Sequence, residues 1–323
     1  MSMACPAPIP GLELVDLRQV TGSALIPLLD EQIAWWRRTL HWDFSASAEL
    51  VVRFVNLQSL YGCALLSGSR VAGYAYYILE DHKGLIGDVY MLREFAAPRW
   101  ENRLIECTLD TLLQAHRVRR VESQLLLIDA PVDHVMPYAN HVRMFRRTFM
   151  MRGPAAAPLN GGRSEDAILF EPWRDERIDD AARLVAGSYQ GHVDSDINDQ
   201  YQSPFGARKF LANIIQYPGC GRFCQPASFV VFRKDTGIPC GLILASMVSP
   251  GVGHITQVCV DRNSRGRAIG YEMLRHSIAV LEELGCDRVG LTVTASNRDA
   301  VRLYEEMGFA AVSDFAAHVW TGF

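Results

Sequence analysis

The sequence predicts an α/β protein, of the α+β kind, in which two similar halves follow one another along the chain. Short apolar strands alternate with amphipathic helices in the C-terminal half, and a less regular version of the same succession precedes them. A length of 323 residues is typical of two domains. With 49% hydrophobic and 21% charged residues, the composition is that of an ordinary globular protein.

The C-terminal half supplies the clearer pattern. Apolar residues recur every three or four positions in the expected helices and alternate with polar residues in the expected strands. In chain order we expect a strand at 167–171, a helix at 178–189, a polar loop, a helix at 205–216, strands near 228–233, 241–248 and 254–260, a helix from 269, a strand at 288–294, a helix around Tyr304 and a last strand near 311–320.

The N-terminal half repeats part of this order. We expect strands at 71–77 and 87–92, a helix at 99–116, a strand at 121–128 and, as the counterpart of the helix around Tyr304, a helix at 138–150. The turn at 93–103 contains no glycine and several bulky residues, which would keep a phosphate away from the backbone. An unrelated α/β domain is the alternative interpretation of this half.

A segment rich in Pro, Gly and small residues separates the halves at 153–164. It divides the chain into an N-terminal domain at 1–153, a linker at 154–164 and a C-terminal domain at 165–323. Because only one strand follows Phe309, the C-terminal half would leave a sheet edge exposed. We therefore expect the two halves to complete each other's sheets or to pack edge to edge.

One turn in the C-terminal half carries most of the functional information. Val258 and Val260 alternate with Cys259 and Asp261 as in a strand, and a helix follows. The first residues of a helix offer unpaired N–H groups and a partial positive charge, and small residues let a phosphate approach them. We therefore expect a pyrophosphate to bind the backbone of Arg265, Gly266, Arg267, Ala268, Ile269 and Gly270. The Gly-Lys-Ser/Thr run of a Walker A loop is absent.

This turn resembles the acyl-CoA signature of the GCN5-related N-acetyltransferase superfamily, which reads Arg or Gln, two residues, Gly, one residue, then Gly or Ala. Arg265, Ala268 and Gly270 fill the three places. Ala268 departs from the usual glycine, and the cradle survives if its φ is negative. A second run resembles the superfamily's pattern in the helix beside the pantetheine arm, through Asn297, Ala300, Leu303, Tyr304, Gly308 and Phe309.

The resemblance implies a tandem acyltransferase fold, with a mixed, mostly antiparallel sheet that splays at the cofactor and is flanked by helices. It implies acetyl-CoA as co-substrate, bound only by the second half. The backbone of Val258, Cys259 and Val260 would hold the thioester and pantetheine. Asn297 would contact the cofactor or act as an N-cap. Tyr304 would protonate the leaving thiolate, since a phenol with a pKa of about 10 is protonated at neutral pH, or it is a packed core aromatic.

The general base stays open. The loop at 189–201 lies between the two helices that border the acceptor site in the superfamily, and it contains His192 and Asp194. These two side chains could bind a cationic amine or take its proton, or they could cap the next helix. An amine that arrives neutral and the terminal carboxylate of Phe323 are further options. Cys259 as a nucleophile would need a neighbouring base, and the sequence names none.

We therefore expect an acetyl-CoA-dependent N-acetyltransferase that acetylates a primary amine of a small molecule or protein, directly within a ternary complex. A non-catalytic acyl-CoA sensor or interaction module is the alternative. The acyl chain could also be longer than acetyl.

Charge and composition narrow the partners and the location. A formal charge of −4, from 32 Lys+Arg and 36 Asp+Glu, argues against a nucleic-acid surface. An apolar run of about 18 residues and a secretory signal are both missing from the sequence. The eight cysteines are scattered as in reduced cytosolic proteins, and the pair Cys220 and Cys224 has no second ligand pair for a metal. We expect a cytoplasmic monomer or homodimer without nucleic-acid, membrane or metal partners.

Overall fold

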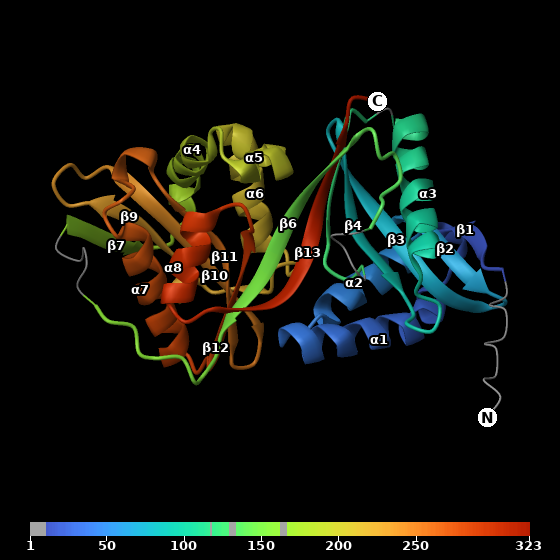
Figure 1. The fold of residues 1–323 in the computed structure, drawn as a ribbon, viewed down its shortest axis with the longest axis horizontal. Helices are drawn as coiled ribbons and strands as arrows, with labels where there is room; N and C mark the ends of the chain where they lie inside the picture. Colours follow the sequence, from blue (N-terminus) through green and yellow to red (C-terminus); the bar gives the residue numbers. More distant parts are fainter. Residues whose placement is uncertain (1–10, 117, 129–133, 162–166) are drawn as a thin grey trace. The chain divides into compact units, whose positions relative to one another are not determined.

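The computed structural model describes residues 11–116, 118–128, 134–161 and 167–323, which fall into two compact units (Figure 1). The N-terminal unit contains the residues up to Trp35 together with Phe44–Met144 and Phe315–Phe323. The C-terminal unit contains Trp36–Asp43 and Phe145–Asp314. The units therefore do not end at the sequence-based boundaries of 153 and 165.

The N-terminal unit is a mixed sheet with helices on both faces. The strand order is β1 (Glu13–Asp16), β2 (Tyr61–Ser67), β3 (Arg70–Glu80), β4 (Lys83–Met91), β5 (Arg120–Leu125) and the end of β13 (Ala310–Thr321). Only β4 and β5 are parallel neighbours. Helix α3 (Pro98–His116) packs on one face. Helices α1 (Gly22–Leu40) and α2 (Ser45–Asn56) pack on the other.

The C-terminal unit has the same layers. Its strand order is β6 (Val142–Arg152), β12 (Arg288–Thr294), β11 (Val252–Val260), β10 (Pro239–Ser249), β9 (Phe229–Arg233) and β7 (Ile168–Pro172), with β8 (Arg222–Phe223) also on β10. Helices α7 (Ile269–Glu283) and α8 (Arg298–Glu306) cover one face. Helices α4 (Ile178–Tyr189) and α6 (Pro204–Gln216) cover the other, with short α5 (Val193–Ile197) between them in the chain. The expected mixed, mostly antiparallel sheet flanked by helices is confirmed.

Each unit receives one strand from the opposite half of the chain. In the C-terminal unit β6 pairs antiparallel with β12, from Arg152 opposite Val289 to Arg147 opposite Thr294. In the N-terminal unit β13 pairs antiparallel with β5, from Ala316 opposite Leu125 onward. The expectation that the halves complete each other's sheets is confirmed. The two exchanged strands cover sheet edges that would otherwise expose unpaired backbone groups.

The helix expected at 138–150 is wrong, because this segment is largely strand β6. The arginines at 143, 146 and 147 are spaced as on one face of a helix. The segment is nevertheless a strand, and its last four residues are buried. Phe149 is only 2% exposed and stacks on His254 at a centroid distance of 5.6 Å. The sequence patterns also left α1, α2, β1 and β2 unidentified.

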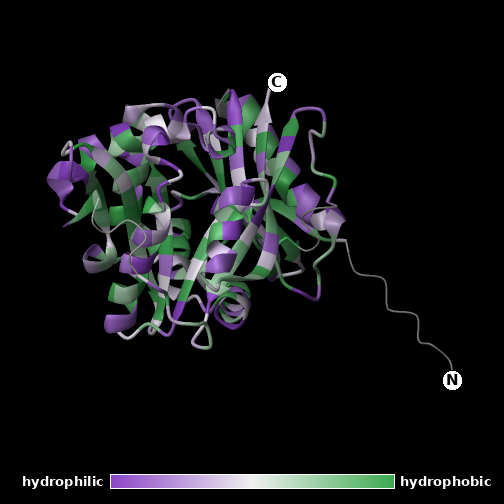
Figure 2. Cartoon of the chain, turned by 60° about the vertical axis from the view of Figure 1, so that its left-hand side comes forward, coloured by the Kyte–Doolittle hydropathy of each residue, from purple (hydrophilic) through white to green (hydrophobic). Residues whose placement is uncertain are grey.

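The splay expected at the cofactor occurs between β11 and β12. Their parallel pairing covers only Val252–Ile255 and Arg288–Leu291, so the ends of both strands diverge. The N-terminal unit shows the same short pairing between Lys83–Ile86 of β4 and Arg120–Ser123 of β5. Figure 2 shows hydrophobic residues, in green, interspersed with hydrophilic residues, in purple, along the strands and helices. The repeat of the short parallel pairing supports the expectation of two pseudo-repeated halves.

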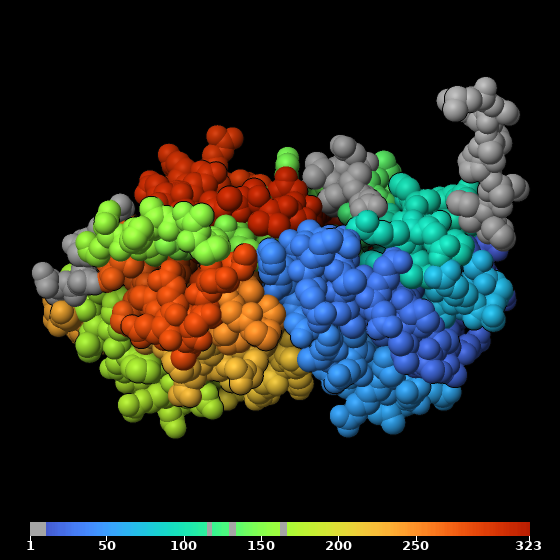
Figure 3. Space-filling model, turned by 90° about the horizontal axis from the view of Figure 1, so that it is seen from below, coloured from blue at the N-terminus to red at the C-terminus, as the bar shows by residue number. Residues whose placement is uncertain are grey.

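The described part of the expected linker lies against the C-terminal unit. Arg152 Nη2 donates to the carbonyl of Ala157 at 2.7 Å, and the Tyr271 hydroxyl donates to the carbonyl of Asn160 at 2.7 Å. Leu159 packs on the core that α7 and α8 share with the sheet. Figure 3 shows this segment as a light-green band across orange and red helices. Residues 154–161 are therefore anchored, while 162–164 lie outside the described residues.

The expectation of reduced cysteines is wrong for one pair. Cys63 of β2 and Cys107 of α3 form a disulfide. Their separation of 44 residues gave no local signal of proximity. The described free cysteines are Cys220, Cys224, Cys240, Cys259 and Cys286.

The described residues contain no helix that is both long and apolar enough to cross a membrane. Within the same residues, His, Cys, Asp and Glu side chains form no group of three that could hold a metal ion.

Candidate functional site

A cleft of about 650 Å³ opens where β11 and β12 diverge in the C-terminal unit. Its walls are the end of β11, the turn into α7, the middle of β12 and the start of α8, with α4 and α5 closing one side. Of the expected site residues, the cleft is lined by His192, Asp194, Val258, Cys259, Val260, Arg265, Gly266, Ala268, Ile269, Gly270, Asn297 and Tyr304. The divergence of two strands thus creates a slot that ends at a helix N-terminus.

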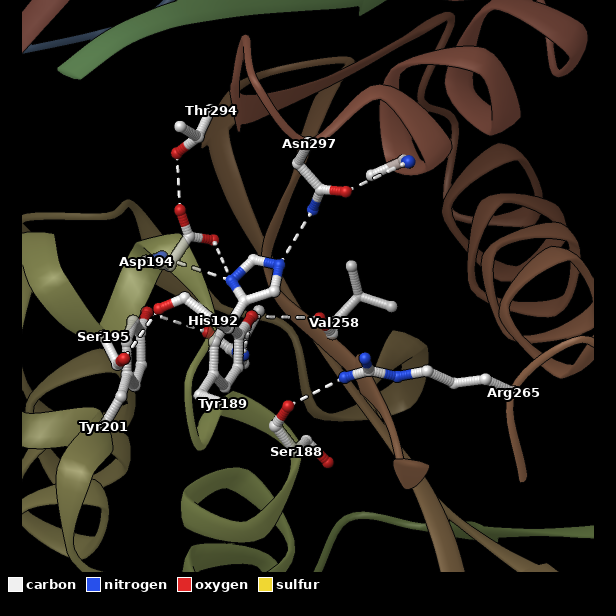
Figure 4. Close-up of polar contacts among 12 residues, drawn as sticks. Ser188, Tyr189, His192, Asp194, Ser195, Tyr201, Val258, Arg265, Thr294 and Asn297 are labelled. Carbon is white, nitrogen blue, oxygen red and sulfur yellow. Dashed lines mark hydrogen bonds and ion pairs between the residues drawn. The ribbon is translucent and has the colours of Figure 1, made fainter. Parts of the chain in front are cut away.

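The turn into α7 is held from below by Arg265. Its guanidinium donates to the carbonyl of Ser188 at 2.7 Å (Figure 4). It also donates to the carbonyl of Val260 at 3.4 Å. Gly266 has a φ of 73°, in the left-handed region that favours glycine, and a Cβ there would meet no atom within 4 Å. Gly270 lies in the first turn of α7, where a Cβ would make only ordinary contacts with Leu303 and Val260. The backbone is therefore open to a ligand at this turn.

Ala268 does not have the negative φ that the sequence analysis required of it. It is the N-cap of α7 and has a φ of 56°, so the negative φ required for an unstrained alanine is absent. A left-handed conformation costs a non-glycine residue about 1–2 kcal/mol. The turn keeps the glycine-like geometry of the signature, and the alanine methyl is accommodated at that cost.

Replacing Ala268 by glycine is expected to raise the free energy of unfolding by up to about 1 kcal/mol, because the relief of strain exceeds the added entropy of the unfolded chain. Urea denaturation of wild type and variant measures the change. Ala186→Gly, inside α4 where no left-handed residue is needed, serves as control and should be destabilising by about 1 kcal/mol. A destabilised Ala268→Gly variant would contradict the strain assigned to this turn.

Arg267 is placed differently from Arg265. It does not line the cleft but a separate pocket of about 400 Å³ with Arg233, Lys234 and Asp235. Its backbone still belongs to the turn. Arg265 and Arg267, two residues apart in the turn, therefore line different pockets.

The surroundings of Cys259 do not favour its use as a nucleophile. Its side chain is 7% exposed and packs in the core beneath α4 and α6. Burial raises the pKa of its thiol to about 12, so the thiol is protonated at neutral pH. Cys259 therefore contributes backbone and packing to the cleft wall, and the reactive thiolate is absent.

Tyr304 lies on the inner face of α8 and lines the cleft. Burial is the main cause that raises the pKa of its phenol, and the Asp194 carboxylate adds to the effect. The phenol is therefore protonated at neutral pH and can act as a proton donor. The end of α8 has the expected left-handed glycine, since Gly308 has a φ of 82°.

Asn297 joins the cofactor side of the cleft to its opposite side. Its Oδ1 accepts from the Ala300 N–H at 3.3 Å, which makes it the N-cap of α8. Its Nδ2 lies 3.3 Å from Nε2 of His192 (Figure 4). Asn297 therefore caps α8 and lines the cleft at the same time.

His192 and Asp194 lie together at the start of α5. Nδ1 of His192 lies 3.7 Å from Oδ2 of Asp194, and the Thr294 hydroxyl donates to Asp194 Oδ1. His192 also caps α5 by accepting from the Asp194 N–H at 3.2 Å. The other aspartates of this loop, Asp196 and Asp199, are not among the cleft residues. One carboxylate, rather than three, faces the slot.

Several cleft residues were not singled out by the sequence. Tyr201 donates to Gln257 Oε1 at 3.2 Å, Gln257 Nε2 donates to the Tyr189 hydroxyl at 2.9 Å, and Tyr189 donates to the carbonyl of Val258 at 3.3 Å. The rings of Tyr189 and Tyr201 stack at 4.3 Å. Arg147 of β6 also lines the cleft. The aromatic content of the 189–201 loop could have signalled the first group, whereas nothing local marks Arg147.

The terminal Phe323 is not part of this cleft. Its ring stacks on His141 at 5.3 Å within the N-terminal unit. The lining of the cleft comes from the C-terminal unit and excludes it. The carboxylate of Phe323 as general base stays a prediction.

The start of α3 in the N-terminal unit, which follows β4 as α7 follows β11, is packed against other described parts of the chain. Glu101 lies in the first turn of α3. Its carboxylate is buried, 3.6 Å from Nδ1 of His134. Asn102 donates to the carbonyl of Val135 at 2.8 Å, and Met136 belongs to the core against α3. A negative charge and a packed segment thus stand at this helix N-terminus.

Comparison with known proteins agrees with this geometry. The family model described as "Acetyltransferase (GNAT) family" matches residues 193–309. A mycothiol acetyltransferase of Thermobispora bispora is 26% identical over 76% of this chain and 78% of its own length. One of Salinispora arenicola is 27% identical over 55% of each chain. The N-alpha-acetyltransferase 30 of Xenopus laevis is 35% identical over 18% of this chain and 21% of its own.

Solved structures share the fold along nearly the whole chain. A GCN5-related N-acetyltransferase from Sphaerobacter thermophilus has a TM-score of 0.64 at 18% identity, covering 96% of this chain and 97% of its own. A tandem GNAT protein from the clavulanic acid biosynthesis pathway has a TM-score of 0.57 at 14% identity, covering 96% and 98%. Residues 193–309 therefore match the acetyltransferase (GNAT) family, and nearly the whole chain shares the fold of these solved structures.

Proposed function

We propose that the protein is an acetyl-CoA-dependent N-acetyltransferase that acetylates a primary amine directly within a ternary complex. One observation carries this proposal. A single cleft is lined by the open turn at α7, by Tyr304 and by the His192–Asp194 pair. Cofactor groove, acid and candidate base therefore face one space of about 650 Å³.

The residues of the turn fit the diphosphate of acetyl-CoA. Gly266 in its left-handed conformation and Gly270 at the helix start leave the backbone N–H groups accessible. The diverging strands β11 and β12 leave room for an extended arm between them. Bound acetyl-CoA would supply the activated thioester. The side chains of this chain would supply orientation and proton transfer.

The proton transfers can be assigned to named groups. Tyr304, with its raised pKa, would give its proton to the sulfur as the C–S bond breaks. The proton lost by the amine nitrogen as it forms the new C–N bond would go to His192, oriented by Asp194 and Asn297. The protonated Cys259 supports direct transfer over a covalent enzyme intermediate.

The N-terminal unit is proposed not to bind acyl-CoA. The Glu101 carboxylate lies in the first turn of α3, where a phosphate would need N–H donors, and like charges repel each other. Met136 and its neighbours fill the adjoining space. This unit would act as scaffold, and its half of the chain would supply part of the cleft wall through β6.

A small-molecule acceptor is favoured over a protein N-terminus. The long match is to a protein named mycothiol acetyltransferase, whereas the matches named N-alpha-acetyltransferase cover only 57 residues. A match of 57 residues is too short to include both the cofactor turn and the acceptor side of the cleft. The longer match therefore gives more support for the kind of acceptor.

Calorimetric titration with acetyl-CoA, followed by a thiol-release screen against amines, tests the proposal. Gly270→Trp should abolish binding by filling the turn, whereas Leu284→Trp, exposed at the other end of the same helix, should bind normally. Binding without turnover of any amine would favour the acyl-CoA sensor. No heat and no thermal shift with the wild-type protein would overturn the proposal.

A further inference from the structure

Arg147 is the cleft residue that comes from the first half of the chain. It lies on β6 directly opposite Thr294 of β12, and Thr294 in turn holds Asp194. Burial raises the pKa of both Tyr201 and Tyr304, Asp194 raises it further, and Arg147 lowers it. Arg147, Asp194, Tyr201 and Tyr304 all line the cleft. This places opposite charges together at the acceptor end of the cleft.

The other charges of the cleft belong to its cofactor end. Arg265 is bonded to the carbonyls of Ser188 and Val260 beneath the turn. Asp299 is in the first turn of α8 and forms an exposed ion pair with Arg302. The acceptor end is left with the charge pair of Arg147 and Asp194. A balanced pair suits an acceptor that itself carries both charges better than it suits a polycation.

We propose that the acceptor is an amine that carries a carboxylate next to its nitrogen, as in an α-amino acid, and that Arg147 binds this carboxylate. The inference rests on the proposed function. A guanidinium has five N–H donors in a planar fork, so Arg147 can grip a carboxylate with two of them while keeping its contacts within the protein. The amine then lies toward His192 and Asp194, and Tyr304 lies on the side of the departing sulfur.

Matched acceptor pairs test this inference on the full-length protein. Glycine, L-alanine and L-phenylalanine are each compared with their amides, which carry no negative charge. Thiol release from acetyl-CoA gives kcat/KM for each acceptor. The variants are Arg147→Gln, Arg147→Lys and, as control, Arg146→Gln, which removes an equal charge from the neighbouring position where the arginine pairs with Asp314.

The expected result is a change in the ratio of acid to amide. Arg147→Gln should lower kcat/KM for the carboxylate acceptors about 10- to 100-fold, as for loss of a charge-assisted hydrogen bond, mainly through KM. The amides should change less than threefold. Arg147→Lys should recover part of the loss, since it keeps the charge without the fork. Arg146→Gln should behave as wild type, and calorimetry should show unchanged acetyl-CoA affinity in every variant.

Three outcomes would overturn the inference. They are equal losses for acids and amides in Arg147→Gln, a wild-type enzyme that uses the amides but not the acids, and turnover of neither class. The proposed function is separately at stake only if acetyl-CoA itself fails to bind or if no amine of any class is acetylated. The two failures are therefore distinguishable.

Discussion

Replacing Tyr304 by phenylalanine is expected to lower kcat by roughly 100- to 10,000-fold, the range for loss of a general acid. The affinity for acetyl-CoA should change less than twofold, because phenylalanine keeps the ring that packs at 7% exposure and removes only the hydroxyl. Steady-state thiol release gives kcat, and calorimetry gives the dissociation constant. The raised pKa of the phenol further predicts that Tyr304 itself causes no loss of activity between neutral pH and its ordinary pKa of about 10.

A matched control separates this role from general damage to the helix. Tyr217→Phe removes the same atom from an exposed tyrosine just beyond α6 and should leave kcat unchanged. Equal kcat in Tyr304→Phe and wild type would remove Tyr304 from its assigned role. A parallel loss of acetyl-CoA binding would assign it to packing instead.

A fragment of residues 165–323 is expected not to fold, because it lacks β6. In the chain, β6 covers the edge of β12 and buries Phe149, Met150 and Met151, which are 2%, 2% and 8% exposed. At about 2 kcal/mol for each buried side chain, their loss is comparable to the whole stability of a domain, about 5–15 kcal/mol. Arg152 also donates to the carbonyl of Met307 at 2.8 Å, at the end of α8.

The matched fragment is residues 142–314, which keeps β6 and omits the part of β13 that belongs to the N-terminal unit. Both fragments lack Trp36–Asp43 of the C-terminal unit, so β6 is the main difference between them. It should be soluble and melt cooperatively by circular dichroism, whereas 165–323 should be aggregated or unfolded. A stable, soluble 165–323 fragment would show that the exchanged strand is dispensable.

The cofactor turn was predictable from the sequence because its information is local. A strand, a basic turn with small residues and a helix start lie within 13 consecutive positions, 258–270. Helices with a regular apolar period, such as α3, α4 and α6, were placed to within a residue or two for the same reason. Ala268 is the exception, since the sign of φ depends on the three-dimensional course of the turn.

The strand β6 was mistaken for a helix because strand pairing is a long-range property. Its partner β12 lies over 130 residues away in the chain, and the arginines of β6 have no alternating pattern that would reveal it. The disulfide between Cys63 and Cys107 was missed for the same reason, because residues far apart in the sequence carry no local signal that they are close in the fold. The early helices α1 and α2 were missed because no motif anchored that region.

The sequence by itself determined the layered α/β architecture, the phosphate-type turn and the presence of Tyr304, His192 and Asp194, because periodicity and short motifs act over one or two turns of chain. The tertiary structure alone decided which half completes which sheet, and so brought Arg147 of the first half opposite Thr294 of the second. It also decided that one carboxylate faces the cleft while its neighbours in the loop do not. The physical reason is that strand pairing and burial are settled between segments far apart in sequence, by edge coverage and shared core, rather than within them.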